Sequence, residues 1–239
     1  LQKQADCRKK IREASNILLE LINEVLDMSK LESGEILLEE KPFDVYKTIN
    51  DVMDLVSRQA DERGIKVEQT IEIEHRKLLG SSLYLKRMLM NILSNAVKYN
   101  KDYGNIDLSC KEIPSHSTES TMLEFTCRDT GIGMSNGFKE HVFESFAREQ
   151  KGGASKFGGT GLGMTITKNL VDMMHGSIAV KSVQGKGTAF TIELTLQLAG
   201  KRAAAAHESK APHANARHHL QKSRILLVDD NDLNREIAI

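Results

Sequence analysis

The sequence predicts an α+β fold, a two-layer sandwich in which helices cover one face of a mixed sheet, with a long helix ahead of it. Three observations support this fold class. Apolar residues recur with helical spacing in some segments and alternate with strand spacing in others. Short turn sequences join neighbouring strand-like segments, which is typical of hairpins. The 239 residues give room for one large domain, or for a medium domain with appendages.

Residues 5–33 are expected to form one long helix, because this segment contains neither proline nor glycine, and Gly34 is expected to end it. Its apolar residues repeat every seven positions in two interleaved sets: Ile11, Leu18 and Val25, and Ala14, Leu21 and Met28. Such a seam is typical of a helix that packs along other helices in a bundle or a dimer. A single amphipathic helix on a globular core is the alternative.

The segments after residue 40 alternate between the two spacings. Helices are expected over residues 45–63, 81–99 and 164–174, and strands over residues 65–73, 105–113, 121–130, 177–183 and 187–196. Ser81 suits the N-cap of the second of these helices. The turn sequence QGKG joins the last two strands. Helices beside hairpin-linked strands predict the sandwich described above.

Composition argues against several classes of function. The 33 basic and 33 acidic residues cancel, so no net charge draws the chain to nucleic acid or to an anionic membrane. No apolar run approaches the roughly 20 residues that a membrane-spanning helix needs. Cys7, Cys110 and Cys127 form no C-x-x-C pair and are expected to be reduced, structural thiols. We therefore expect a cytoplasmic protein that meets a membrane only through regions outside this chain.

The first polar cluster lies in the segment NILSNAVKYN. Asn91, Asn95 and Lys98 follow a helical spacing, so they share one face, opposite the apolar one. Amides and an ammonium group without a carboxylate suit a magnesium ion that phosphate oxygens already carry. An ordinary solvated polar stripe is the alternative for this segment taken alone.

The second cluster is RDTGIGM, in which Asp129 closes a strand and Gly131 and Gly133 allow a sharp turn. A carboxylate only accepts hydrogen bonds, so Asp129 could take the amino group of an adenine. The D-x-G pattern is also common in ordinary turns. Alone, this motif is a weak indication of a site.

The third cluster is SKFGGTGLGMTI, in which glycines stand directly before a helical run. Converging backbone N–H groups and a helix N-terminus favour an anion. Its spacing fits neither a dinucleotide fingerprint nor a P-loop. The segment 135–156 ahead of it is mostly polar, and Phe143 and Phe146 are expected to anchor it as a lid; a small satellite core is the alternative.

In this order, NxLxNAxKY, DTGIGM, FxxF, GGTGLGM and GTAF resemble the N, G1, F and G2 boxes of the histidine-kinase catalytic domain. That fold is shared with gyrase-type and heat-shock-chaperone ATPases, and the resemblance covers nearly all of residues 5–198. It implies that ATP and Mg²⁺ are bound. It also implies that the γ-phosphoryl group passes to a histidine and is then relayed to a receiver aspartate.

The resemblance assigns roles in the phosphate half of the site. Asn95 would ligate magnesium, and Asn91 would support that role or face the γ-phosphate. Lys98 would meet phosphate oxygens, Arg148 would approach the terminal phosphate, and Tyr99 would pack beside the adenine.

The same resemblance assigns the base half of the site and the lid. Asp129 would take the adenine amino group, with Gly131 and Gly133 making room and Thr188 assisting through water. The lid hinge and its phosphate contacts would come from Gly159, Thr160, Gly161, Leu162 and Gly163.

Asn91 distinguishes the kinase from its relatives. Gyrase-like ATPases have a glutamate at this position that activates water, and an amide cannot act as a general base near neutral pH. Slow hydrolysis is therefore expected, which disfavours a gyrase-like ATPase. A regulatory module that binds nucleotide without phosphoryl transfer remains the alternative, because none of the eight histidines lies in the family's H-box context.

The resemblance also divides the chain. Residues 1–40 would be the second helix of a dimerisation and histidine-phosphotransfer hairpin, 41–198 the catalytic domain, 199–223 a linker and 224–239 the start of a receiver domain. Asp229 and Asp230 would help to bind magnesium in a completed receiver. The implied partners are a second copy of the parent protein, joined through the hairpin, and a response regulator or receiver domain. One strand cannot bury a core, so residues 224–239 are expected to be unfolded or loosely docked.

Overall fold

A computed structural model of the chain describes residues 2–32, 41–113, 119–149 and 159–199. Its helices are α1 (Gln2–Glu32), α2 (Val45–Asp61), α3 (Ser82–Lys98), α4 (Asn136–His141) and α5 (Gly163–Met173). Its strands are β1 (Lys41–Asp44), β2 (Lys66–Glu72), β3 (Lys77–Gly80), β4 (Asn105–Ile113), β5 (Ser120–Asp129), β6 (Ser177–Val183) and β7 (Gly187–Leu198). The predictions for Gly34, Asp229 and Asp230, and for the linker and receiver segments from residue 200 onward, lie outside the described residues.

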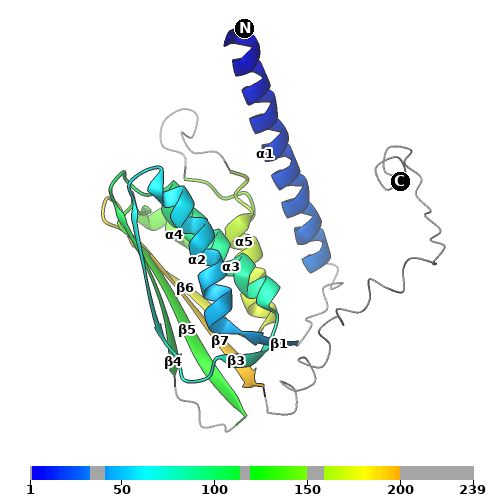
Figure 1. Ribbon diagram of the computed structural model, residues 1–239, viewed down its shortest axis with the longest axis vertical. Helices are drawn as coiled ribbons and strands as arrows, with labels where there is room; N and C mark the ends of the chain where they lie inside the picture. The colour runs from blue at the N-terminus through cyan, green and yellow to red at the C-terminus, as the bar shows by residue number, and fades with distance from the viewer. Residues whose placement is uncertain (1, 33–40, 114–118, 150–158, 200–239) are drawn as a thin grey trace, which may run out of the picture. The chain divides into compact units, whose positions relative to one another are not determined.

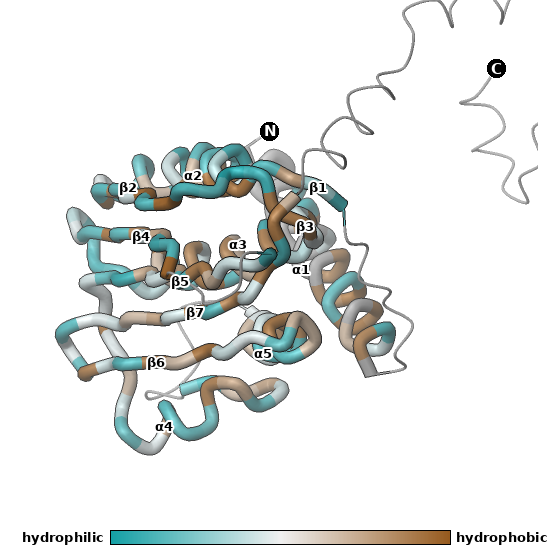
Figure 2. Tube along the Cα trace, turned by 90° about the horizontal axis from the view of Figure 1, so that it is seen from below, coloured by the Kyte–Doolittle hydropathy of each residue, from teal (hydrophilic) through white to brown (hydrophobic). Residues whose placement is uncertain are grey.

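The strands form one mixed sheet in the order β1-β3-β7-β5-β4-β2, and β6 also pairs with β7. Figure 2 shows β2, β4, β5, β7 and β6 following one another across this sheet. The β4–β5 and β6–β7 pairs are antiparallel, whereas β2 and β4 are parallel. A parallel pair requires a crossover, and the chain passes through α3 between these two strands. The predicted mixed sheet is therefore confirmed.

Helices α2, α3 and α5 cover one face of the sheet, as predicted (Figure 1). The core lies between the two layers. Its fully buried side chains include Ile49 and Val56 of α2, Leu85 and Leu89 of α3, and Phe125 of β5. Each such side chain stabilises the fold by roughly 1.5–3 kcal/mol relative to leaving it in water. This packing fixes α3 and α5 beside the sheet and thereby places the polar residues that they carry.

Three short elements were not predicted. Strands β1 and β3 pair with each other in an antiparallel register that joins Phe43 to Leu78. Each has only four residues, which is too short for an alternating pattern to be recognised. Helix α4 has six residues, and its N-cap Ser135 accepts a hydrogen bond from the Phe138 N–H. The predicted N-cap of α3 is confirmed, because the Ser81 hydroxyl accepts from the Tyr84 N–H at 3.4 Å.

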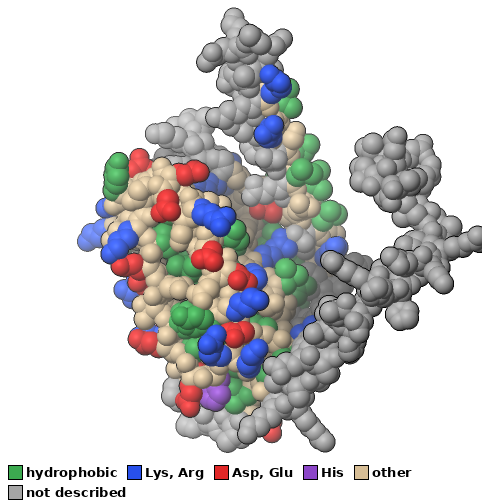
Figure 3. All heavy atoms as spheres, viewed as in Figure 1, with side chains coloured by type: hydrophobic (Ala, Val, Ile, Leu, Met, Phe, Trp, Pro, Cys, Tyr) green, Lys and Arg blue, Asp and Glu red, His purple; other side chains and the backbone are tan. Residues whose placement is uncertain are grey.

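Helix α1 confirms the long helix predicted at the start of the chain. Its seam residues Ile11, Leu18 and Val25 are 61%, 58% and 51% exposed, so no described residue covers them. Hydrophobic side chains accordingly follow one side of α1 in Figure 3. The helix touches α5, where the Asn169 amide lies 3.6 Å from the Met28 sulfur. None of the described helices combines the length and apolar character needed to cross a membrane.

The cysteine prediction is confirmed for two of the three residues. Cys110 and Cys127 are buried, free thiols on β4 and β5. Burial raises the pKa of Cys110 to about 12 and also raises the pKa of Cys127. Both therefore stay protonated and inert at neutral pH. The Cys7 side chain lies outside the described part of the chain.

Candidate functional site

A cavity of about 680 Å³ opens beside the ends of α3, β5 and α5. This volume is typical of a small-molecule site. Most of the predicted site residues line it: Asn91, Asn95, Lys98, Tyr99, Asp129, Gly133, Arg148, Gly159, Thr160, Gly161, Gly163 and Thr188. Gly131 and Leu162 do not; Gly131 supports Asp129 from beside the cavity, and Leu162 is buried in the core. Segments far apart in the sequence thus meet at one cavity.

Asp129 stands at the end of β5, and its two carboxylate oxygens differ. Oδ1 accepts from the Gly131 N–H at 2.8 Å and from the Thr188 N–H at 3.2 Å. Oδ2 accepts no hydrogen bond from the described residues. Burial raises the pKa of Asp129, and the two backbone hydrogen bonds offset part of that rise. The backbone therefore fixes the carboxylate and leaves one acceptor oxygen for a ligand.

Apolar side chains line the cavity together with this carboxylate. They belong to Ile132, Met134, Phe138 and Phe190. Gly133 has φ +60° and packs on the end of β6, where a Cβ would collide with the Val183 carbonyl oxygen. Only glycine lets this turn pass so close to the strand. The cavity is therefore partly apolar beside this turn, and the Asp129 carboxylate is a fixed acceptor there.

Ser182 of β6 forms hydrogen bonds that support the turn after Asp129. Its hydroxyl lies 2.9 Å from the Thr188 hydroxyl, is 3.0 Å from the Gly187 carbonyl oxygen, and accepts from the Met134 N–H at 2.8 Å. Sequence reasoning missed Ser182, because a lone serine in an alternating strand carries no signal. It links β6 and β7 to the turn after Asp129.

The two asparagines of α3 have different surroundings. The Asn91 amide nitrogen donates to the Gly163 carbonyl oxygen at 3.0 Å and to the Thr167 hydroxyl at 3.1 Å. Asn91 therefore ties α3 to the first turn of α5. Asn95, one turn later, lines the cavity and makes no side-chain hydrogen bond to another described residue. Its amide oxygen remains available to a ligand or a metal ion.

Lys98 reaches from α3 towards the glycine-rich loop. Its ammonium nitrogen lies 4.9 Å from the centroid of the Tyr99 ring. Gly159 comes so close that a Cβ at this position would collide with the ammonium group. The Lys98 cation, the Asn95 amide and Gly163 at the start of α5 all line the cavity.

The segment between the second and third motifs only partly matches its prediction. Phe143 packs edge to face on Phe190, with ring centroids 6.4 Å apart, so it anchors the segment as expected. Phe146 is 66% exposed and has φ +62°, so the expectation that it also anchors is wrong. Its N–H donates to the Gly161 carbonyl oxygen at 3.2 Å, and this contact holds its backbone against the loop.

Glu24 of α1 also lines the cavity, which the sequence did not predict. The Thr160 hydroxyl donates a hydrogen bond to its carboxylate and accepts one from the Leu162 N–H at 3.1 Å. In the sequence, Glu24 stands out only as a charge flanking the apolar seam. A residue of the opening helix therefore helps to hold the loop before α5.

The cavity combines an apolar end that carries an open acceptor with a polar end that carries a cation and an open amide. The described residues include no group of three His, Cys, Asp or Glu side chains that could hold a metal ion. A divalent cation bound here would therefore take most of its ligands from water and from the oxygens of another bound molecule. This arrangement suits a ligand with a flat amino-bearing ring at one end and phosphates at the other.

Comparison with known proteins identifies the family of this domain. Residues 80–198 match the family described as histidine kinase-, DNA gyrase B- and HSP90-like ATPase. Residues 80–198 are a histidine kinase-type ATPase domain. The domain begins at the end of β3 and includes all three motif clusters. Elements α2 and β2 precede the matched range but pack into the same core and sheet.

Relatives of this ATPase domain are hybrid and signal-transduction kinases. The chain is 33% identical over 196 residues to the signal transduction histidine-protein kinase BarA of Escherichia coli, covering 82% of this chain and 21% of BarA. It is 34% identical to hybrid signal transduction histidine kinase A of Dictyostelium discoideum, covering 79% of this chain and 9% of that protein. The crystal structure of full-length ShkA in complex with AMPPNP matches with a TM-score of 0.70 and 27% identity, over 82% of this chain and 39% of ShkA. The chain thus spans a small part of its relatives' length.

Proposed function

We propose that the ATPase domain binds ATP in this cavity, with the adenine at Asp129 and the phosphates at Lys98 and the start of α5. The observation that carries the proposal is the open Oδ2 of Asp129 at the apolar end of a 680 Å³ cavity. This half-buried carboxylate oxygen opens onto the cavity and has no hydrogen-bond donor among the described residues, and an adenine amino group would donate to it. The crystal structure of ShkA in complex with AMPPNP supports an adenine nucleotide as the ligand.

The polar end fits the phosphates and a magnesium ion. The open Asn95 amide oxygen would hold Mg²⁺, while Lys98 and Arg148 would meet phosphate oxygens. Bound Mg²⁺ supplies neutralisation of phosphate charge during phosphoryl transfer. Thr188, held by Ser182, would assist base binding through water, and Tyr99 would flank the base.

The reaction proposed for the parent protein is transfer of the γ-phosphoryl group of ATP to a histidine. The oxygen that bridges the β- and γ-phosphates would keep the bonding electrons and leave with ADP. A histidine ring nitrogen would form the new bond to phosphorus. Asn91 offers no general base and its amide nitrogen is occupied by α5, so water would not be activated and ATP would persist until a histidine arrives.

The remaining assignments extend this proposal to the whole chain. Helix α1 would be half of a dimerisation and phosphotransfer hairpin, which agrees with its exposed seam. A second copy of the parent protein would cover that seam. Residues 224–239 would begin a receiver domain, with Asp229 and Asp230 as magnesium ligands, and a receiver aspartate would take the phosphoryl group.

Calorimetric titration with ATP, with and without Mg²⁺, tests the proposal. The chain should bind Mg²⁺–ATP at one site. Asn95→Ala should lose most of the dependence on Mg²⁺, whereas the control Asn50→Ala, in an amide pair with Gln69, should behave like the wild type. A folded chain that binds no ATP would contradict the proposal.

A second measurement separates the two candidate functions. A phosphotransfer hairpin that carries its histidine is added to the ATP-bound chain, and phosphohistidine is measured. Transfer supports the kinase. Saturable binding without transfer would favour the regulatory module instead.

A further inference from the structure

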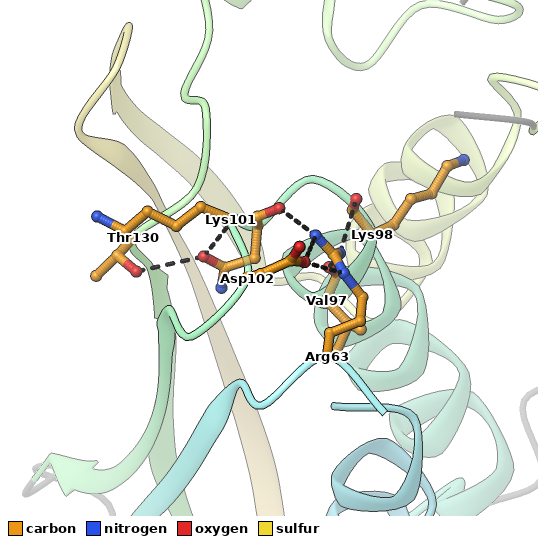
Figure 4. A network of polar contacts seen from close by, with 7 residues as sticks. Arg63, Val97, Lys98, Lys101, Asp102 and Thr130 are labelled. Atoms are coloured by element: carbon orange, nitrogen blue, oxygen red, sulfur yellow. Dashed lines mark hydrogen bonds and ion pairs between the residues drawn. The ribbon is translucent and has the colours of Figure 1, made fainter. Parts of the chain in front are cut away.

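Arg63 lies between α2 and β2, belongs to none of the sequence motifs and does not line the cavity. Its guanidinium nevertheless reaches the end of α3 (Figure 4). It donates to the carbonyl oxygens of Val97 at 2.6 Å, Lys98 at 3.4 Å and Asn100 at 2.7 Å. It also pairs with Asp102 at 2.9 Å. One side chain thus holds three carbonyl groups at a helix end.

The carbonyl groups of Lys98 and Asn100 depend most on an external donor. The Val97 carbonyl oxygen also accepts from the backbone N–H of Tyr99 and from that of Asn100, the latter at 3.3 Å. The last carbonyl groups of a helix have no partner within the helix, and the helix end carries a partial negative charge. The planar fork of an arginine can reach several acceptors at once, which a lysine cannot do in the same geometry. Arg63 therefore serves as a C-terminal cap for the turn that carries Lys98 and leads into Tyr99.

The capped segment is also connected to the Asp129 turn. The Asn100 side chain is buried; its amide nitrogen donates to the Asn105 carbonyl oxygen at 3.1 Å, and its Oδ1 accepts from the Thr130 hydroxyl at 3.3 Å. The Ile132 N–H donates to the Tyr99 carbonyl oxygen at 3.0 Å. The segment that Arg63 caps is therefore linked to this turn at two points. Thr130 is reached through Asn100, and Ile132 is reached through Tyr99.

We propose that Arg63 is a positioning residue of the nucleotide site, which fixes the end of α3 against the turn after β5. This inference rests on the proposed ATP-binding function. Without the guanidinium, the last turn of α3 loses its cap, and Lys98 and Tyr99 lose their fixed position relative to Asp129. The two halves of the site would then have to be aligned when the nucleotide binds, which lowers affinity.

Asp102 provides an internal control, because it touches the same guanidinium from the solvent side. Its side chain is 67% exposed, against 30% for Arg63, and exposed ion pairs contribute little. Asp102→Asn removes the ion pair and leaves the three carbonyl contacts in place. If the ion pair mattered more than the cap, this variant would resemble the loss of Arg63.

The test compares ATP affinity by calorimetry in Arg63→Met, Arg63→Lys, Asp102→Asn and the core variant Val56→Ala, all at a temperature where each is folded. Arg63→Met is expected to bind ATP about tenfold more weakly. Arg63→Lys should recover part of this loss, and Asp102→Asn should stay within about twofold of the wild type. Val56→Ala, which lowers the melting temperature from a fully buried position on α2, should keep wild-type affinity.

Hydrogen exchange of the nucleotide-free protein gives a readout that does not depend on ATP. Arg63→Met should speed exchange of the Ile132 and Tyr99 amides by about tenfold, whereas Val56→Ala should not do so selectively. Wild-type affinity in Arg63→Met, or equal losses in Arg63→Met and Val56→Ala, would overturn the inference. If the wild type bound no ATP, the proposed function would fail, and unchanged exchange in Arg63→Met would separately overturn the coupling.

Discussion

The β4–β5 hairpin has a carboxylate near each end, and the two differ in how many of their oxygens accept hydrogen bonds. Glu112 is opposite Leu123 near one end, and Asp129 is opposite Ile106 at the other. Glu112 accepts from the backbone N–H groups of Glu74 at 2.6 Å and His75 at 2.8 Å, from the Thr121 hydroxyl at 2.7 Å, and pairs with the His75 ring at 2.6 Å. Both of its oxygens are therefore occupied.

The pKa values follow these contacts. Burial opposes ionisation of Glu112, but the hydrogen bonds from His75, Thr121 and Glu74 outweigh it and lower the pKa of Glu112 to about 2. At Asp129 burial outweighs two backbone hydrogen bonds, and the pKa is raised. A carboxylate with filled acceptor sites is a structural part of the fold, whereas one left open at a cavity is available to a ligand.

The largest expected effect comes from Asp129→Asn. The amide oxygen can keep the contacts to Gly131 and Thr188, but the amide NH₂ then faces the adenine amino group. ATP affinity should fall by about 10- to 100-fold, which corresponds to the loss of a hydrogen bond to a charged group. Calorimetry measures this change, and Asp107→Asn on the same hairpin is the matched control. If Asp129→Asn bound ATP as tightly as the wild type, Asp129 would not be a ligand-binding carboxylate, and the contrast with Glu112 would fail.

At the other end of the hairpin, Glu112→Gln should affect stability and not binding. A glutamine cannot accept on both terminal atoms, so some of the four donors are left unmatched. The free energy of unfolding should fall by about 1–3 kcal/mol, as measured by denaturant titration, while ATP affinity stays within about twofold. The exposed Glu68→Gln serves as control and should change stability by less than about 0.5 kcal/mol. A loss of ATP binding in Glu112→Gln would show that the two ends are not independent.

The pH dependence of stability should have opposite signs at the two ends. Because the pKa of Glu112 is lowered, its contribution is present above its ordinary value of 4.5 and is lost as the pH falls toward about 2. Because the pKa of Asp129 is raised, its ionisation removes stability as the pH rises through that raised value. The difference in free energy of unfolding between the wild type and Glu112→Gln should therefore shrink in acid. The free energy of unfolding of Asp129→Asn should rise relative to that of the wild type between acid and neutral pH. Denaturant titration at each pH measures both quantities.

The hydrogen bond to Glu112 also raises the pKa of His75. Its contribution is fully present below the ordinary value of 6.5 and is lost as the pH rises through the raised one. His75→Gln should therefore differ most from the wild type on the acid side of neutrality. A difference that grows with rising pH would contradict the pairing with Glu112.

The smallest effects are expected for the two asparagines of α3, which again contrast an occupied side chain with an open one. Asn91 is engaged by α5, whereas Asn95 is open to the cavity. Asn91→Ala should lower the free energy of unfolding by about 1 kcal/mol, and Asn95→Ala should lower it less. In Mg²⁺-dependent ATP affinity the order should be reversed. Equal effects of both variants on both quantities would mean that the two amides have the same role.

The sequence was sufficient for the elements that are long and periodic. The helices and strands that build the sandwich were predicted to within a few residues, because burial of one face imposes the spacing. Strands β1 and β3 were missed, since four residues carry no period and the strands are stabilised by pairing, β1 with β3 and β3 with β7.

The candidate site was predictable where a motif places its residues close together in the chain. Asn95, Lys98 and Asp129 were found in this way and line one cavity, although their roles toward ATP remain predictions. Glu24 and Arg63 were missed because each acts on a distant segment; Glu24 and Thr160 are 136 positions apart. These contacts arise from the packing of α1 and of the α2–β2 segment. A local sequence pattern therefore cannot predict them.

The most direct test of the role of Asp129 compares ATP with inosine triphosphate on the wild-type chain by calorimetry. The two nucleotides differ at the position where adenine carries its amino group, and hypoxanthine presents a carbonyl oxygen there. Because a carboxylate cannot donate to that oxygen, ATP should bind at least about tenfold more tightly. Equal affinities would show that the open oxygen of Asp129 does not recognise adenine, and would contradict the assignment of the base to this end of the cavity.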